Sequence, residues 1–260
     1  MGLRKFSGGV LVAVCAAFLL LAGGQAQTNP RDALWQIVIG MCVPNQMQNH
    51  DPRPCAEVNL QEGSAHGFAI LKDLRGETQF LLVPTVRISG IENPAVLAPD
   101  ATNYFDRAWE ARSYVFGALH RTLPPDDTSL AVNSASSRSQ DSLHIHIDCV
   151  RTDVYEDLHS GQETFGEQWR PLQHPLLGHP YKARWVAGEH LGGNNPFKLL
   201  AQGVPGAEQH MGDYTLVLIG LTRPDGTKGF ILLEDQVDKA AHDLASGEEL
   251  QDHACRIGRP

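Results

Sequence analysis

Residues 142–148 read SLHIHID, so polar and apolar side chains alternate without a break. Successive side chains of a β-strand point to opposite faces of the sheet, which makes this segment suited to a strand with a single apolar face. The apolar face would be buried. The other face would carry Ser142, His144, His146 and Asp148 in one row. The pattern predicts a strand in an antiparallel sheet, with the polar row facing solvent.

Two imidazoles on one strand face allow two kinds of phosphorus chemistry. In the first, neutral His144 attacks a phosphoanhydride, water hydrolyses the resulting phosphoramidate, and His146 donates to a phosphoryl oxygen. In the second, both histidines and a carboxylate bind a metal such as zinc. Asp148 lies about 13 Å along the strand from His144 at about 3.3 Å per residue, so this row alone cannot surround one ion. We therefore expect catalytic His144 and His146 and no metal or other cofactor.

The short polar segment before this strand, residues 133–140, is the candidate phosphate-binding element. Backbone N–H groups and a guanidinium in a tight turn suit phosphate oxygens. We expect Asn133, Arg138, Gln140 and Ser142 to contact the substrate. The alternative is an ordinary solvated hairpin turn with Arg138 as a structural or surface charge.

The rest of the chain predicts an α+β fold, because strands and a few helices follow one another with little βαβ alternation. Hairpins are expected over residues 67–88 and 215–235, the second around the turn signal 224–228. Strands are expected over 129–134, 142–150 and 181–186, and helices over 32–41, 102–119 and 195–202. The two hairpins resemble each other in size and pattern, so the second could belong to a degenerate copy of the first half. Only one half has His-x-His, so one active site is expected.

The N-terminal 26 residues have the pattern of a secretory signal. Arg4 and Lys5 precede an apolar run over residues 10–22, and the small residues Gly24 and Ala26 follow. The segment is either a cleaved signal peptide or a membrane anchor. Either outcome places the domain formed by residues 27–260 outside the cytoplasm, and the family resemblance described below implies the periplasmic face of a bacterial inner membrane.

The net charge of −9 makes nucleic acid an improbable partner, because phosphate backbones require positive charge at the contact. Outside the leader four cysteines remain, an even number in an oxidising compartment. Three pairings are possible, and free buried thiols are the alternative. We favour Cys42–Cys55, which would close a short loop, and Cys149–Cys255, which would tie the C-terminal segment to the strand of the histidines.

A polar turn followed by a strand with alternating histidines resembles the histidine-triad (HIT) superfamily, whose pattern is His-φ-His-φ-His-φ-φ. Beyond that motif, the chain is similar throughout to the bacterial CDP-diacylglycerol pyrophosphatases. The similar stretches are VPNQMQNHDPRPCAEV, LLVPTVRISGIENP, LAVNSASSRSQDSLHIHIDCVR, GHPYKARWV, NPFKLLAQGVPGAEQHMGDY and LQDHACRI.

The resemblance implies a HIT-like antiparallel sheet with flanking helices. It also implies hydrolysis of CDP-diacylglycerol to CMP and phosphatidate in phospholipid metabolism. The middle triad histidine, the nucleophile of the superfamily, corresponds to His144 and the third to His146. Ser142 stands at the first position, where the superfamily has a histidine. The alternatives are a metal-dependent phosphohydrolase using His144 and His146, or a nucleotide- or lipid-binding protein with a decayed triad.

Overall fold

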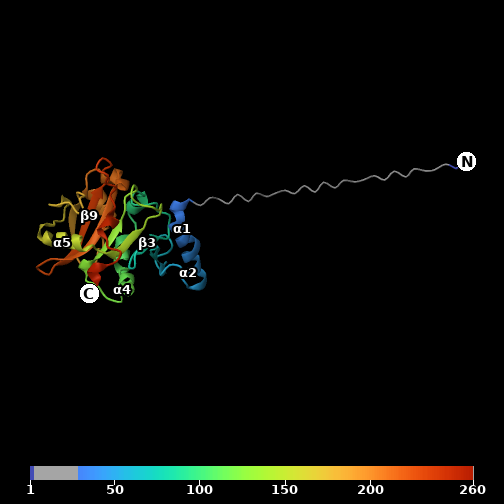
Figure 1. Ribbon diagram of the computed structural model, residues 1–260, viewed down its shortest axis with the longest axis horizontal. Coiled ribbons are helices and arrows are strands. Elements are labelled where there is room, and N and C mark those ends of the chain that lie inside the picture. Colours follow the sequence, from blue (N-terminus) through green and yellow to red (C-terminus); the bar gives the residue numbers. More distant parts are fainter. Residues whose placement is uncertain (3–28, 260) are drawn as a thin grey trace.

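A single nine-stranded antiparallel sheet organises the molecule, with strand order β1-β2-β3-β5-β4-β8-β9-β7-β6. The computed structural model describes residues 1–2 and 29–259, so the predicted leader lies almost entirely outside the described residues. The helices flank the sheet, and Figure 1 shows α1 and α2 at one side of the molecule and α5 at the other. The predicted α+β class is confirmed.

The strands are β1 (Glu57–Asn59), β2 (Phe68–Lys72), β3 (Phe80–Pro84), β4 (Thr128–Val132), β5 (Ile145–Cys149), β6 (Arg170–Pro171), β7 (Lys182–Ala187), β8 (Tyr214–Thr222) and β9 (Lys228–Gln236). The α-helices are α1 (Ala33–Ile37), α2 (Val43–Asn49), α3 (Tyr104–Glu110), α4 (Ser113–Leu119), α5 (Thr152–Ser160) and α6 (Pro196–Gly203). Short 3-10 turns complete the fold: η1 (Pro30–Asp32), η3 (Pro94–Leu97), η4 (Pro125–Asp127), η5 (Gln162–Thr164), η6 (Ala207–Gln209), η7 (Met211–Asp213), η8 (Gly247–Leu250) and η9 (Arg256–Gly258). Both predicted hairpins are present, as β2–β3 and β8–β9.

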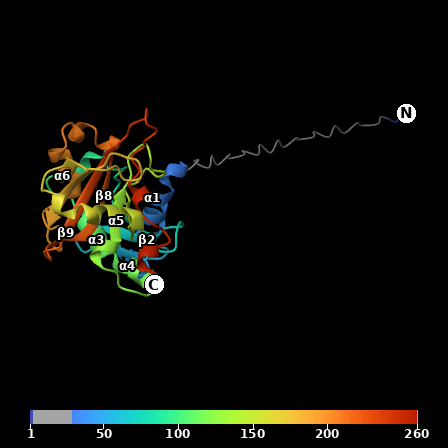
Figure 2. The same cartoon turned by 60° about the vertical axis from the view of Figure 1, so that its left-hand side comes forward.

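The two faces of the sheet are covered differently. On one face, Ile145 and Ile147 of β5 belong to the main core, under α3, α4 and α6. The opposite face has two smaller apolar clusters. One joins α1 and α2 to β1, β2 and β3, and the other joins α5 to β7, β8 and β9. Strand β5, which carries His146 and directly follows His144, lies between β3, whose Leu81 belongs to the first cluster, and β4, whose Ala131 belongs to the second. Figure 2 shows α5 at the front of the molecule and α1 to one side of it.

The strand order repeats. The first half of the chain builds the order β2-β3-β5-β4, and the second half builds β6-β7-β9-β8. Every neighbouring pair is antiparallel, and β4 and β8 join the halves at the middle of the sheet. By this order β9 corresponds to β5, so hairpin β8–β9 matches β4–β5. The likeness in sequence pattern had predicted instead that hairpin β8–β9 corresponds to β2–β3, and the strand order does not support that correspondence.

Two predicted helices have different bounds in the structure. The first continues past Met41 to Asn49, where an irregular loop was expected, through a π-helical turn, η2 (Val38–Cys42). Pro44 has no N–H to donate, and the wider π turn directly before it accommodates the missing hydrogen bond. The predicted helix 102–119 is divided into α3 and α4 at Ala111 and Arg112.

Both favoured disulfides are present. Cys42–Cys55 joins residues 13 apart in the sequence, and Cys149–Cys255 joins residues 106 apart. The second fastens the C-terminal segment to the end of β5. Among the residues with described positions, no helix has the length and apolar character needed to cross a membrane.

Candidate active site

The polar row of β5 is buried, which corrects the expectation that it faces solvent. Ser142 is 1% exposed, His144 7%, His146 4% and Asp148 0%. Register explains part of this: His146 lies between Leu81 of β3 and Ala131 of β4, the neighbouring positions on the same face. The segment that includes η8 supplies Glu248, and the residues after it supply His253, as polar partners for the row.

The imidazole of His144 has a defined tautomer. Its Nδ1 lies 2.7 Å from the backbone carbonyl oxygen of Ser142. A carbonyl oxygen can only accept, so Nδ1 carries the proton and Nε2 keeps its lone pair. Burial lowers the pKa of His144, which keeps the ring neutral near pH 7. Nε2 is therefore an available nucleophile or ligand atom.

The imidazole of His146 has the opposite tautomer. The amide nitrogen of Gln79 lies 2.7 Å from Nδ1 of His146 and 3.1 Å from a carboxylate oxygen of Glu248. A nitrogen that donates to Glu248 also donates to Nδ1, so the proton of His146 is on Nε2. Burial, and then the neighbouring His144, lower the pKa of His146 to about 3. Its Nε2 is buried and has no hydrogen-bond partner within the described part of the chain.

The two neutral rings are therefore complementary. Their centroids are 4.8 Å apart and their planes are inclined at 65°. His144 offers a lone pair at Nε2, and His146 offers an unused N–H at Nε2. Such a pair can attack a centre and donate to an oxygen bonded to it.

Glu248 is the anion on which the surrounding hydrogen bonds converge. It accepts from Gln79, from the Asn133 amide at 3.2 Å, and from His253 Nε2 at 3.3 Å. Burial alone would raise the pKa of Glu248, but the hydrogen bonds from His253, Gln79 and Asn133 hold it well below its usual value. The carboxylate is therefore ionised, and it orients Gln79 toward His146.

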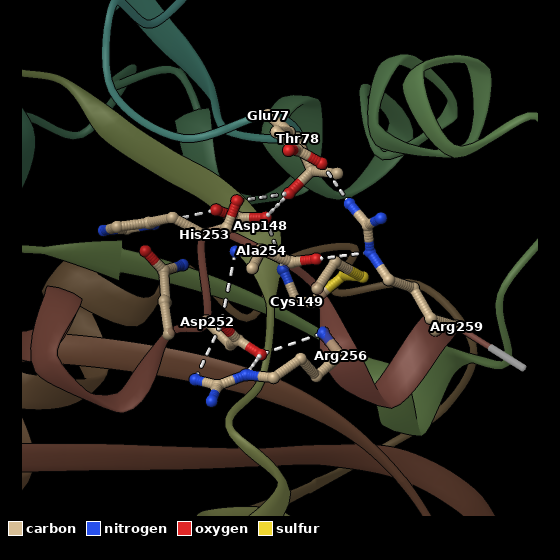
Figure 3. The surroundings of a disulfide bond; sticks show 12 residues. Glu77, Thr78, Asp148, Cys149, Asp252, His253, Ala254, Arg256 and Arg259 are labelled. Atoms are coloured by element: carbon tan, nitrogen blue, oxygen red, sulfur yellow. Dashed lines mark hydrogen bonds and ion pairs between the residues drawn. A yellow bond between two sulfur atoms is a disulfide. The ribbon is translucent and has the colours of Figure 1, made fainter.

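Asp148, the last member of the polar row, continues the same network (Figure 3). It accepts from Thr78 at 2.6 Å and from the backbone N–H of Cys149, and its second oxygen lies 2.8 Å from His253 Nδ1. Hydrogen bonds to Asp148 and Glu248 raise the pKa of His253 to about 10. His253 is thus a cation between two carboxylates, and a continuous series of polar contacts leads from Asp148 to His146.

Of the four expected substrate contacts, Asn133 lies nearest to this network. Its side-chain oxygen accepts from the backbone N–H of Glu248 at 3.1 Å while its amide donates to the Glu248 carboxylate. Ser142 contributes its backbone carbonyl to His144. No hydrogen bond of its hydroxyl to His144 is seen among the described residues, so the backbone carbonyl alone fixes the tautomer of His144 from this position.

Arg138 and Gln140 make structural contacts instead. Both terminal nitrogens of Arg138 bond to Glu92, and one also bonds to Asp141 at 3.3 Å. The Gln140 side-chain oxygen accepts from the backbone N–H of Leu34 at 3.0 Å. These contacts tie the turn to neighbouring loops and to α1, and a contact with substrate stays a prediction for both residues.

Sequence reasoning missed Gln79, Glu248 and His253. Gln79 directly precedes β3, and its position opposite His146 depends on the register between β3 and β5. Glu248 and His253 follow the last strand in a segment without periodicity. The stretch LQDHACRI, already noted as similar to the bacterial family, was the one signal that could have drawn attention to His253.

Comparison with known proteins defines the class to which this fold and histidine site belong. A family model described as CDP-diacylglycerol pyrophosphatase matches residues 29–259. A CDP-diacylglycerol pyrophosphatase from Yersinia pestis is 42% identical over 242 residues, which is 92% of this chain and 91% of that protein. The protein is thus a hydrolase. The chain belongs to the CDP-diacylglycerol pyrophosphatase family.

Proposed function

We propose that the protein hydrolyses the phosphoanhydride of CDP-diacylglycerol to CMP and phosphatidate, through a cytidylyl group on His144. The observation that carries this proposal is the opposite tautomers of the two buried rings. They leave a lone pair on Nε2 of His144 and an unused N–H on Nε2 of His146. The substrate follows from the family and from the name of the Yersinia pestis relative.

The reaction has two displacements. Nε2 of His144 attacks the phosphorus that bears cytidine, a P–N bond forms, and the anhydride P–O bond breaks with its electrons leaving on phosphatidate. Water then attacks the same phosphorus, the P–N bond breaks, and CMP leaves with the oxygen from water. His146 donates its Nε2 proton as a hydrogen bond to a phosphoryl oxygen in both steps.

The proposal includes a relationship to the HIT superfamily in spite of Ser142. Two features support it: an antiparallel sheet whose strand order repeats, and a nucleophile strand with alternating histidines. The repeated order favours a duplicated ancestor whose second half lost its histidines. Ser142 is compatible with activity, because its carbonyl fixes the tautomer of His144.

We further propose that the enzyme acts in phospholipid metabolism at the periplasmic face of the inner membrane. The lipid substrate resides in a membrane. The basic and apolar pattern of the first 26 residues would export the chain or anchor it there.

Two experiments test the chemistry. Hydrolysis in ¹⁸O-labelled water should place the label in CMP, because water attacks the cytidine-bearing phosphorus; label in phosphatidate would contradict the proposed direction of attack. Alkaline quenching during turnover, followed by mass spectrometry, should show a cytidylyl adduct on His144, because phosphoramidates survive base. A metal-bound hydroxide would hydrolyse the substrate in one step and give no adduct.

A further inference from the structure

A second cluster of titratable side chains lies in the second half of the molecule. His179 precedes β7, Asp235 lies near the end of β9, and Asp243 lies in the following loop. Each offers one ligand atom, and the three atoms lie within 4.8 Å of one another. None of these residues belongs to the network around His144.

The carboxylate of Asp235 lacks the partners that such a buried group needs. Asp235 is 2% exposed, and its Oδ2 is buried without a hydrogen-bond partner in the described part of the chain. Asp148, at the end of the corresponding strand, is equally buried but accepts from Thr78, Cys149 and His253. A buried carboxylate oxygen without a hydrogen-bond partner is costly, so Asp235 Oδ2 is a candidate ligand atom for a cation.

The charge of the cluster points to a cation. Asp243 is 3% exposed, and its Oδ1 accepts from the backbone N–H of Ala245 at 2.8 Å. Among the described residues, no lysine or arginine forms an ion pair with Asp235 or Asp243. His179 Nδ1 is 3.9 Å from Asp243 and 2.7 Å from Glu249, which brings a third carboxylate to the same place.

We infer that His179, Asp235 and Asp243, with Glu249 beside them, bind one divalent transition-metal ion such as Zn²⁺ or Mn²⁺. One imidazole nitrogen and several carboxylate oxygens suit these ions. The ion displaces the proton between His179 Nδ1 and Glu249 into solvent, and its two positive charges balance the two buried aspartates. Each ligand atom needs to move by less than about 2 Å to reach a metal–ligand distance of about 2.0–2.2 Å.

The ion joins three elements: the end of β9, the loop containing Asp243, and η8, which carries Glu249. Glu248, the preceding residue of η8, is the anion beside His146. Metal binding therefore adds a further link to the segment that supports the histidine site, without contacting the substrate.

Direct binding to the full chain tests this inference. Protein without a polyhistidine tag is stripped with EDTA, dialysed, and titrated calorimetrically with ZnCl₂ or MnCl₂ near pH 7.5. We expect one ion per chain with Kd below about 10 μM, and a higher Tm in the presence of the ion. Failure of both ions to bind the wild-type chain more tightly than about 1 mM would overturn the inference.

Variants locate the ion. Asp235→Asn should weaken binding of the ion about 100-fold. Asp243→Asn should have the same effect, and it replaces the first variant in the test where Asp235→Asn folds poorly. The matched control is His210→Ala, because His210 and Asp213 form an exposed pair of the same residue types, 3.9 Å apart. Binding that survives both aspartate variants, or that His210→Ala removes, would place the ion elsewhere and contradict the assignment. These readouts do not depend on turnover of any lipid.

Discussion

The two halves of the sheet share a strand order but bury opposite kinds of side chain at the corresponding place. In the first half, His146 of β5 and His144, directly before the strand, lie on the face covered by Glu248 of η8. In the second half, β9 carries Ile231 and Leu233 on that face, within an apolar cluster. One scaffold thus packs a polar network on one side and an apolar core on the other. The site therefore depends on the segment that covers the strand as much as on the strand itself.

Substitutions at matching positions in the two halves should have different effects, one on turnover and the other on stability. His144→Ala should lower turnover at least about 10⁴-fold, because the proposed nucleophile is lost. Ile231→Ala should instead destabilise the fold by about 2–5 kcal/mol and leave the turnover of folded enzyme nearly unchanged. Steady-state hydrolysis of CDP-diacylglycerol in detergent micelles and urea unfolding measure the two effects. Near-normal turnover of His144→Ala would show that His144 is not the nucleophile.

Both disulfides involve cysteines of the first half, and removing each in turn shows how much each one stabilises the fold. Replacing Cys149 and Cys255 by alanine should cost roughly 4–5 kcal/mol, because that bond closes a span of 106 residues. Replacing Cys42 and Cys55 should cost about 3 kcal/mol, because the span is 13 residues. Urea unfolding of the two double variants measures the difference. A larger loss from the Cys42–Cys55 pair would reverse the expected ranking.

Glu248→Gln tests the network that the second half lacks. The substitution keeps the size of the side chain but removes the charge that orients Gln79, so the tautomer of His146 is no longer fixed. We expect kcat to fall about 10- to 100-fold with a smaller change in KM, equivalent to the loss of one or two charge-assisted hydrogen bonds. Glu208→Gln, at an exposed position of η6, is the matched control and should leave kcat nearly unchanged. Equal losses in the two variants would contradict this role of Glu248.

Ser142→His tests whether the first triad position can be restored. Ser142 is 1% exposed, so an imidazole there would be overpacked, at a cost of about 1–3 kcal/mol. We expect about tenfold lower turnover and a lower Tm. Ser142→Ala, which keeps the backbone carbonyl, should retain turnover within about threefold. A faster Ser142→His enzyme would mean that the pocket still accommodates a full triad.

The pH dependence of stability is the smallest expected effect, because His253 is partly exposed and solvent screening reduces its contribution well below what the pKa shift alone would give. The pKa of His253 rises from 6.5 to about 10 on folding, so its contribution is complete below about pH 6.5 and is lost as the pH approaches 10. Comparing urea unfolding near pH 6.5 and pH 9.5 should show a decline in wild type that is reduced in His253→Gln. An equal decline in both proteins would assign the effect to other groups.

Local patterns predicted the elements well, because hairpins and capped helices are determined by neighbouring residues. The strands around His144 and the helix after Asn195, whose side chain caps α6, were found this way. Long-range packing was not predictable from alternation alone. The pattern at residues 142–148 shows one polar face but cannot show that Glu248 and His253 cover it. For the same reason, the sequence could not show that Arg138 forms an ion pair with Glu92.

The distance in sequence between Gln79, Asn133 and Glu248 has a consequence for biosynthesis. A chain that emerges N-terminus first can pair β3 with β5 before residue 248 exists, but it cannot orient His146 at that stage. Hydrolytic competence therefore arises after the sheet, when residues 247–255 have closed over it and Cys255 has met Cys149. Nascent or C-terminally clipped molecules would remain inert toward the lipid pool, whether or not their sheet had formed.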